Sequence, residues 1–558
     1  MDSSLDEVRV GETGIPHGAG DENSLLGEAR GEATRISCGA GYGENPRGKD
    51  NPRPRLALLC GANFRPLPCP NGGKIAGNPH LAGEGPCKGR RFPAPLATLS
   101  KTLENVMEAP HVLVIPFPAQ GHVKPLMELS HRLVKHGIKV TFLNSKFNHK
   151  RIVLAMSAKG DEEVGKISFA ALPDGLGPED DRSNQGKLGE ALWNVMPKHL
   201  EEFIKKINND STETKIKHVI ADWSVTWAIE VAAKMGIPIA AYWPASGAFI
   251  SKLFHVPKFI EDRIIDDNGV PYSNQMIKLS PTMPPMNTDH FAWLCMGDNG
   301  TSKEIFNLIL QVRESAKLVD FFFLNSFYEL EPFVTELFPN ILCIGPLGSS
   351  SRGNFWPEDS TCLSWLDQQP ANSVIYVAFG SHTMLDKRRI EELALGLELS
   401  GQPFLWVVRP DITKGAAIEY PDGFIKRVAS RGQIVGWAPQ RDVLAHPSVA
   451  CFLSHCGWNS TIEGLSMGIP FLCWPYFADQ FLNESYICDV WKVGLKLKAT
   501  ENGLISRYEI KTKVAMLLGD EQIKANSMKL KEMAVKNVSH GGASSKNLEW
   551  FIEKLIMS

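Results

Sequence analysis

The stretch HVLVIPFPAQGHVKPLMELSHRLVKHGIKVTFLNS, residues 111–145, predicts a strand, a helix and a second strand in direct succession. Residues 111–117 and 139–145 are short apolar runs rich in β-branched side chains, and 123–137 repeats its apolar residues with a helical period until Gly137 ends it. Strands that alternate with helices lie parallel in one sheet, buried on both faces. This stretch therefore indicates the α/β class.

The alternation recurs along the rest of the chain. Further strands are predicted at 218–223, 238–243, 373–380 and 449–455. We expect two doubly wound, Rossmann-like domains, 107–345 and 361–542, joined by a Gly-, Ser- and Pro-rich linker at 346–360 and followed by a last helix at 543–558. Because ligands of such sheets bind beyond the carboxyl ends of the strands, the cleft between the domains is the candidate site.

Residues 1–106 differ in composition from the rest of the chain. They contain 17 of the 48 glycines, scattered without a period, and few apolar runs. Such a segment cannot bury enough apolar surface to offset its ordering entropy. We expect it to be disordered.

Composition and charge limit the classes of partner. The 59 Lys and Arg residues nearly balance the 62 Asp and Glu residues, so no overall field favours nucleic acid or an anionic membrane. No run of 18 apolar residues predicts a membrane span, and the polar start MDSSLDEVRVGE is unlike a secretory signal. The 11 cysteines lack the spacing of a disulfide framework, which favours reduced thiols in the cytoplasm. A small-molecule partner is expected.

His122 is the first candidate catalytic residue. The prolines of PFPAQGHVKP and a positive φ at Gly121 would form a tight turn that presents the imidazole at the carboxyl end of a strand. Imidazole titrates near neutrality and suits removal of a proton from a hydroxyl. Asp222 ends another strand on the same rim, where a carboxylate would orient the ring. The alternatives are a histidine satisfied within its turn and an aspartate that caps the next helix.

Residues 437–480, WAPQRDVLAHPSVACFLSHCGWNSTIEGLSMGIPFLCWPYFADQ, are the most informative segment. A strand runs into His455 and Gly457 and then into a helix, whose N-terminal amides favour a phosphate, and Ser381 could add a hydroxyl or simply cap a helix. Positive charge is expected from the helix end and from His455. Glu463 either closes a capping box with Ser460, which periodicity favours, or accepts ribose hydroxyls.

Other residues of this segment allow two interpretations each. Trp437 is a core residue or stacks on a base, and Asp479 with Gln480 either caps a helix or binds sugar hydroxyls. The triplet around Ser466 matches a hydrolase nucleophile elbow, but the serine falls near the end of a predicted helix, so we interpret the match as coincidence. Cys451, His455 and Cys456 lack a second pair of metal ligands, and no Asp-x-Asp triplet occurs, so no metal site is expected.

These motifs resemble those of the plant family 1 UDP-glycosyltransferases. WAPQ, HCGWNS, Glu463 and the terminal Asp-Gln match the signature box of that family, PFPAQGH resembles its N-terminal catalytic turn, and the likeness covers about 107–558. The resemblance implies the GT-B fold and a last helix that crosses back to the N-terminal domain. It also implies a chain that starts near Met107, so that residues 1–106 would be no part of the native protein or a dispensable tail. For the nucleoside, it implies that Trp437 stacks on uracil, that Ala438 and Gln440 meet base and ribose, and that Glu463 binds the ribose. The residues implied to surround the diphosphate are His455, Gly457, Asn459, Ser460 and Ser381. Those implied to contact the sugar are Trp458, Asp479 and Gln480.

The function expected from residues and resemblance together is an inverting, metal-independent sugar transfer without a further cofactor. UDP-glucose is the expected donor, and a hydroxyl or carboxyl of a small, mostly apolar metabolite is the acceptor. His122 would act as the base and Asp222 would orient it. A monomer is expected. The alternatives are a non-catalytic protein that binds a sugar nucleotide or metabolite, and a serine hydrolase built on Ser466.

Overall fold

The computed structural model describes residues 109–157, 167–182, 184–295, 299–338, 340–348, 353–413 and 418–557. The predicted extension, 1–106, lies outside these residues. In this part of the chain no helix is both long and apolar enough to cross a bilayer.

The N-terminal domain is built on a parallel sheet that has seven strands within the described residues, in the order β3-β2-β1-β4-β5-β8-β9. In sheet order the strands are Ile167–Leu172, Lys139–Ser145, His111–Ile115, Ile216–Asp222, Ile239–Trp243, Phe321–Leu324 and Ile341–Cys343. The short strands β6 (Met276–Ile277) and β7 (Met286–Asn287) form a separate antiparallel pair. Strand order reverses at β1 and β4, which are adjacent, so their carboxyl ends border the crevice where ligands bind in such sheets.

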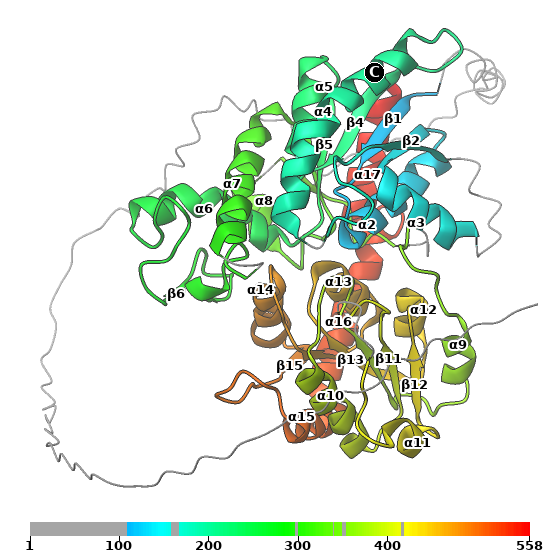
Figure 1. Cartoon of the computed structure of the whole chain (residues 1–558), viewed down its shortest axis with the longest axis vertical. Helices are drawn as coiled ribbons and strands as arrows, with labels where there is room; N and C mark the ends of the chain where they lie inside the picture. The colour runs from blue at the N-terminus through cyan, green and yellow to red at the C-terminus, as the bar shows by residue number, and fades with distance from the viewer. Residues whose placement is uncertain are drawn as a thin grey trace, which may run out of the picture. The chain divides into compact units, whose positions relative to one another are not determined.

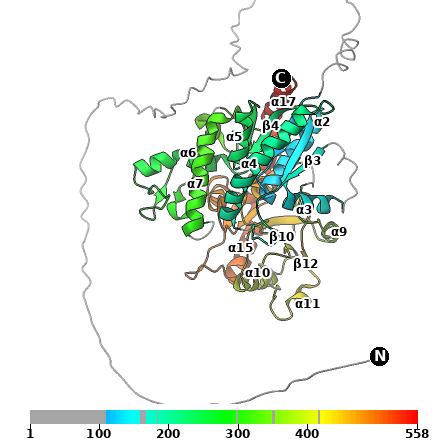
Figure 2. The same ribbon diagram turned by 45° about the horizontal axis from the view of Figure 1, so that its top comes forward.

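Helices cover both faces of this sheet, as the alternation of side chains requires. Leu113 and Ile115 of β1 join one apolar core, and Val112 and Val114 join the other. Figures 1 and 2 show α4, α5 and α7 packed together beside the sheet. The helices of the domain are α2 (Gln120–Lys135), α3 (Lys146–Ser157), α4 (Gln185–Asn209), α5 (Thr226–Lys234), α6 (Gly247–Glu261), α7 (Asn299–Ser315) and α8 (Pro332–Leu337).

The C-terminal domain repeats the plan with a parallel sheet of six strands in the described residues, in the order β12-β11-β10-β13-β14-β15. In sheet order these are Gly432–Val435, Phe404–Val407, Val374–Ala378, Val449–Ser454, Phe471–Cys473 and Gly494–Lys496. The helices are α9 (Thr361–Leu366), α10 (Lys387–Ser400), α11 (Phe424–Val428), α12 (Gln440–Ala445), α13 (Trp458–Met467), α14 (Gln480–Ser485), α15 (Arg507–Gly519) and α16 (Glu521–Val538). Strand order reverses between β10 and β13, which carry the Ser381 and His455 turns.

The last helix, α17 (Ala543–Met557), returns to the N-terminal domain. Leu548, Phe551, Ile552 and Leu555 are buried in the core that also holds Val112 and Val114, and the helix contacts β9 of the N-terminal sheet. Figure 1 shows α17, in red, within the N-terminal domain. The ring of Phe551 contacts Phe323 of β8 at 4.6 Å between centroids. The C-terminal end of the chain thus completes the N-terminal core.

The turn after β1 differs from the expectation. The strand ends at Ile115, two residues early, and α2 already begins at Gln120 and includes Pro125. Gly121 therefore has helical backbone and not the predicted positive φ. His122 lies in the first helical turn, where its amide donates to Ala119 O at 3.0 Å.

Candidate active site

A cavity of about 700 Å³ is lined by residues of both domains. The N-terminal domain supplies the first turn of α2, the ends of β4 and β5, and parts of α4, α6 and α7. The C-terminal domain supplies the turns after β10, β12 and β13 and the start of α14. Of the predicted site residues the cavity is lined by His122, Ser381, Trp437, Ala438, Gln440, His455, Gly457, Trp458, Asn459, Ser460, Glu463, Asp479 and Gln480.

Asp222 lies just behind this wall and holds His122. Nδ1 of His122 lies 2.7 Å from Oδ2 of the fully buried Asp222. Since a carboxylate only accepts, Nδ1 is the donor in this contact, and in the neutral imidazole Nε2 on the far side of the ring then keeps its lone pair. Oδ1 of Asp222 accepts from the Ser224 amide at 2.9 Å, whereas α5 begins after Val225. Asp222 is therefore not the helix cap; it orients the imidazole.

The turn from β13 into α13 presents backbone amides to the cavity. Gly457 is the N-cap of α13, and as a glycine it has no side chain that could cap the first turn. Cys456 has φ 64°, a left-handed conformation that costs about 1 kcal/mol or more for a residue with a side chain. Its amide donates to Ser454 Oγ at 3.1 Å and its carbonyl accepts from Asn483 Nδ2 at 2.9 Å, which hold the strained turn in place. Free amides at such a helix start suit a phosphate.

His455 is enclosed by two glycines. A Cβ on either Gly380, at φ +66°, or Gly457 would come 2.5 Å from Nε2 of the imidazole. Burial and then the nearby Arg409 lower the pKa of His455 to about 3. The ring is therefore neutral near pH 7, and the expectation that His455 supplies positive charge is wrong. The favourable field for an anion comes from the amides and dipole of α13.

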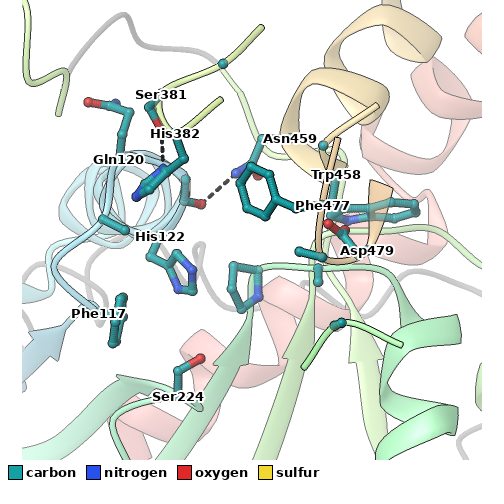
Figure 3. A pocket seen from close by; sticks show the side chains of 18 of the residues that line it. Phe117, Gln120, His122, Ser224, Ser381, His382, Trp458, Asn459, Phe477 and Asp479 are labelled. Atoms are coloured by element: carbon teal, nitrogen blue, oxygen red, sulfur yellow. Dashed lines mark hydrogen bonds between the residues drawn. The ribbon is translucent and has the colours of Figure 1, made fainter. Parts of the chain in front are cut away.

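Ser381 follows β10 and faces the cavity beside a second imidazole. Its hydroxyl hydrogen-bonds with His382 Nδ1 at 2.9 Å, and Figure 3 shows both side chains beside the first turn of α2. Arg409 fixes the loop that carries both residues: it donates to Gly380 O at 2.6 Å and to Thr383 O at 3.0 Å. Ser381 does not cap α10, because Asp386 does.

Glu463 does not close the capping box that periodicity favours. Its Oε2 accepts from Gln440 Nε2 at 2.7 Å, and its Oε1 accepts from Lys124 Nζ of α2 at 2.6 Å. Gln440 Nε2 also donates to Ser460 Oγ at 3.0 Å. The prediction of a cap is wrong because α13 starts earlier, at Trp458, so that Glu463 lies in its middle and faces the cavity.

Trp437 borders the cavity at the end of β12 and rests on a second indole. The ring of Trp356, from the predicted linker, lies 4.8 Å away at 30°. The guanidinium of Arg151 lies 4.6 Å from the centre of the Trp356 ring. Ala438, next in the chain, is buried. One face of Trp437 is thus supported by Trp356, and the indole contributes to the cavity wall.

The three residues predicted to meet the sugar, and Asn459 of those predicted to surround the diphosphate, are partly engaged with protein. Asn459 Nδ2 donates to Gly121 O at 2.6 Å, which Figure 3 shows as a dashed line between α13 and the first turn of α2. The Trp458 indole donates to Asn325 O at 2.9 Å. Asp479 stands at the N-cap position of α14 but its side chain makes no capping hydrogen bond, and its Oδ2 accepts from Asn483 Nδ2 at 2.8 Å. Gln480 Oε1 accepts from the amides of Tyr476 and Phe477 at 2.7 and 3.0 Å. Gln480 therefore holds the loop that shapes this end of the cavity.

Two alternative chemistries find no support in the described residues. Ser466 lies inside α13 and its hydroxyl donates to Ile462 O at 2.6 Å, so it is no nucleophile elbow. Within the described ranges, His, Cys, Asp and Glu side chains form no group of three or more with the arrangement of a metal site.

Sequence reasoning missed several residues of the site. Lys124 stands inside the quoted turn but has no periodic or motif signal that pairs it with Glu463, 339 residues away. Trp356 lies in a stretch interpreted as a linker, and His382 follows Ser381 directly. A tryptophan within a Gly- and Ser-rich stretch is the one signal that could have drawn attention to Trp356.

Two Rossmann-like domains around one cleft, with an oriented imidazole on one wall and a helix start whose amides suit an anion on the other, are the plan of a sugar-nucleotide-dependent glycosyltransferase of the GT-B fold. Known proteins agree. The family model described as UDP-glucoronosyl and UDP-glucosyl transferase matches residues 298–537, and the N-terminal glycosyltransferase domain matches 108–236. The chain belongs to the plant family 1 UDP-glycosyltransferases.

Individual relatives match along most of their length. UDP-glycosyltransferase 83A1 of Arabidopsis thaliana is 45% identical over 460 residues, 80% of this chain and 97% of the relative. Linamarin synthase 1 of Manihot esculenta is 32% identical, over 80% and 97%. Phytolacca americana UGT2 complexed with UDP-2fluoro-glucose and pterostilbene superposes with a TM-score of 0.66 at 28% identity, over 80% of this chain and 99% of UGT2. A UDP-glucose: anthocyanidin 3-O-glucosyltransferase in complex with UDP gives 0.69 at 25% identity, over 81% and 100%.

Proposed function

We propose that this glycosyltransferase transfers glucose from UDP-glucose to a hydroxyl or carboxyl of a small, mostly apolar metabolite, with inversion at the anomeric carbon. The observation that carries the proposal is the 2.7 Å contact between His122 Nδ1 and Asp222 Oδ2 at the wall of the cavity. A protein that only binds a sugar nucleotide needs no such pair. A carboxyl acceptor, already ionised, would need the base least.

His122 is the general base of the proposed reaction. Nε2 takes the proton of the acceptor hydroxyl while the acceptor oxygen attacks the anomeric carbon and the bond to the UDP oxygen breaks. Buried Asp222 fixes the tautomer and stabilises the imidazolium that forms. The electron pair of the broken bond leaves with the β-phosphate of UDP.

The donor is proposed to lie against the C-terminal domain. The amides at the start of α13 receive the diphosphate, where negative charge grows as UDP departs. Trp437 stacks on uracil, and Gln440 and Glu463 take the ribose. Charge stabilisation by amides makes the reaction metal-independent in this proposal.

The acceptor is proposed to lie between α4, α6 and α7. The side chains that line this part of the cavity are mostly apolar and include Trp193, Trp243, Phe249, Leu253, Leu308 and Val312. Such a wall selects by size and apolar area and discriminates weakly between close analogues. The names of two relatives, a 7-deoxyloganetin glucosyltransferase of Gardenia jasminoides and linamarin synthase, support a small-metabolite acceptor.

The test is a panel of small hydroxyl and carboxyl compounds incubated with UDP-glucose, with products identified by mass. On a hydroxyl acceptor, His122→Ala should lower kcat by about 10²–10⁴-fold, the usual worth of a positioned base, and leave UDP affinity unchanged. His136→Ala is the matched control, because His136 is an exposed histidine at the other end of the same helix.

Near-normal turnover of His122→Ala on a hydroxyl acceptor would contradict the assignment of the base. Binding of UDP without transfer to any acceptor would favour a binding protein instead. Turnover that survives excess EDTA supports the metal-independent mechanism. A cytoplasmic monomer is proposed with it, in keeping with the free thiols of the cysteines in the described residues; cell fractionation and light scattering test both.

A further inference from the structure

Helix α2 carries a second functional side chain two residues after His122. Lys124 Nζ lies 2.6 Å from Glu463 Oε1, in the other domain. Both side chains are largely withdrawn from solvent, with 18% and 11% of their surface exposed, and both line the cavity. A desolvated ion pair of this kind is far more sensitive to loss of one partner than a surface pair.

Glu463 is held on both of its oxygens. While Lys124 donates to Oε1, Gln440 Nε2 donates to Oε2 at 2.7 Å. Gln440 is itself fixed, because its Oε1 accepts from Tyr376 OH at 3.2 Å. The two donors come from different domains, so the orientation of this carboxylate depends on both.

The surroundings keep Lys124 charged. Burial alone would lower the pKa of Lys124, but the charges of Glu463 and Glu128, the hydrogen bond to Glu463 and the charge of Glu358 together raise it above its ordinary value. Glu128, one turn further along α2, is 4% exposed. An ammonium in such a site attracts Glu463 more strongly than it would in water.

We infer that Lys124 is a positioning residue for the donor: it orients Glu463 toward the ribose and ties the ribose end of the donor site to the helix that carries His122. The inference rests on the proposed function, in which Glu463 binds the ribose. Each carboxylate oxygen accepts two hydrogen bonds, so Oε1 and Oε2 each keep a position for a ribose hydroxyl while Lys124 and Gln440 remain bound.

The arrangement has a consequence for catalysis. His122 and Lys124 lie in the first two turns of the same helix. The contact between Lys124 and Glu463 therefore fixes the position of His122 relative to the bound donor. Asn459, which donates to Gly121 O at 2.6 Å, acts on the same turn of α2 from the other end of the donor site. In this proposal the donor therefore binds where side chains of the two domains already contact each other.

The test compares Lys124→Met, Lys124→Arg and Glu463→Gln, with exposed Lys135→Met at the far end of α2 as the control. Dissociation constants for UDP and 2′-deoxy-UDP are measured by calorimetry, together with melting temperatures. Lys124→Met should weaken UDP binding about tenfold and reduce the preference for UDP over 2′-deoxy-UDP, Lys124→Arg should stay within about threefold of wild type, and Lys135→Met should have no effect.

Lys124→Met combined with Glu463→Gln should bind UDP about as weakly as Glu463→Gln alone, because both changes disable one unit. Unchanged or tighter UDP binding by Lys124→Met, or full additivity of the two changes, would overturn the inference. If Lys124→Met fails to fold, Lys124→Gln gives the same comparison. If the wild type binds no UDP, the proposed function itself is overturned. If the wild type binds UDP and substitution of Lys124 leaves the dissociation constant unchanged, only this inference is overturned.

Discussion

The imidazole of His455 lies so close to Gly380 that a Cβ on this glycine would come 2.5 Å from Nε2. The two residues follow adjacent strands, β10 and β13, at the point where strand order reverses. The backbone of the loop after β10 therefore packs directly against the imidazole of His455 at the proposed diphosphate site.

Gly380→Ala should damage both stability and donor binding. The φ of +66° costs alanine about 1 kcal/mol, and the clash with His455 adds about 1–3 kcal/mol of overpacking. Urea unfolding and UDP calorimetry measure the two effects. Gly401→Ala is the control, since Gly401 has φ +70° but no atom within 4 Å of its added Cβ, so only the backbone cost should appear. Equal effects of the two substitutions would contradict the role of the contact.

Asp222→Asn should lower kcat on a hydroxyl acceptor by about 10²–10⁴-fold, because an amide no longer enforces the Nδ1–H tautomer or stabilises the imidazolium. UDP affinity should not change. Asp320→Asn is the comparison: Asp320 accepts from the Ile239 amide at 2.8 Å at the amino ends of β5 and β8, and asparagine can still accept this bond, so kcat should not change. Normal turnover by Asp222→Asn would rule out an orienting carboxylate.

Trp356→Ala should weaken UDP binding about threefold to tenfold, because it removes the ring that supports Trp437 at 4.8 Å. Inorganic diphosphate serves as the second probe, since it lacks the base that Trp437 is proposed to hold. Its affinity should stay the same in the variant. A parallel loss for both probes would mean that Trp356 supports the fold and not the base site.

Glu331→Gln should stabilise the protein in a pH-dependent way. Glu331 is 1% exposed, and burial raises its pKa to about 7. Below about pH 4.5 the carboxyl is neutral in both states and costs nothing; as pH rises toward 7 the unfolded state ionises first, so stability falls by up to about 3 kcal/mol. Glutamine removes this loss, and its oxygen can still accept from the Ala248 amide.

The free energy of unfolding of Glu331→Gln relative to wild type should therefore increase between pH 5 and pH 8. Denaturant titrations at the two pH values measure it, with exposed Glu501→Gln as the reference. A difference that is constant with pH would show that Glu331 is ionised at little cost in the folded state.

Local pattern was sufficient for the class of the fold and for the motif residues. Apolar runs of strand length separated by helical periods predict parallel sheets, because the period of the side chains follows directly from backbone geometry. The same reasoning failed at element ends: α2 starts at Gln120, where the amides of His122 and Val123 donate to Ala119 O and no side chain of the N-cap residue marks the start. It also failed at Glu463, where a local cap and a distant partner compete for one carboxylate.

The sequence by itself determined that this chain forms two parallel α/β domains and that it carries the family's imidazole, aspartate and signature box. Only the tertiary structure decided which groups meet: His122 with Asp222, Lys124 with Glu463, Trp356 with Trp437. The physical reason is that secondary structure depends on the order of neighbouring residues. These hydrogen bonds, ion pairs and ring contacts depend on packing that brings together residues far apart in the chain, and no local period encodes which residues will meet.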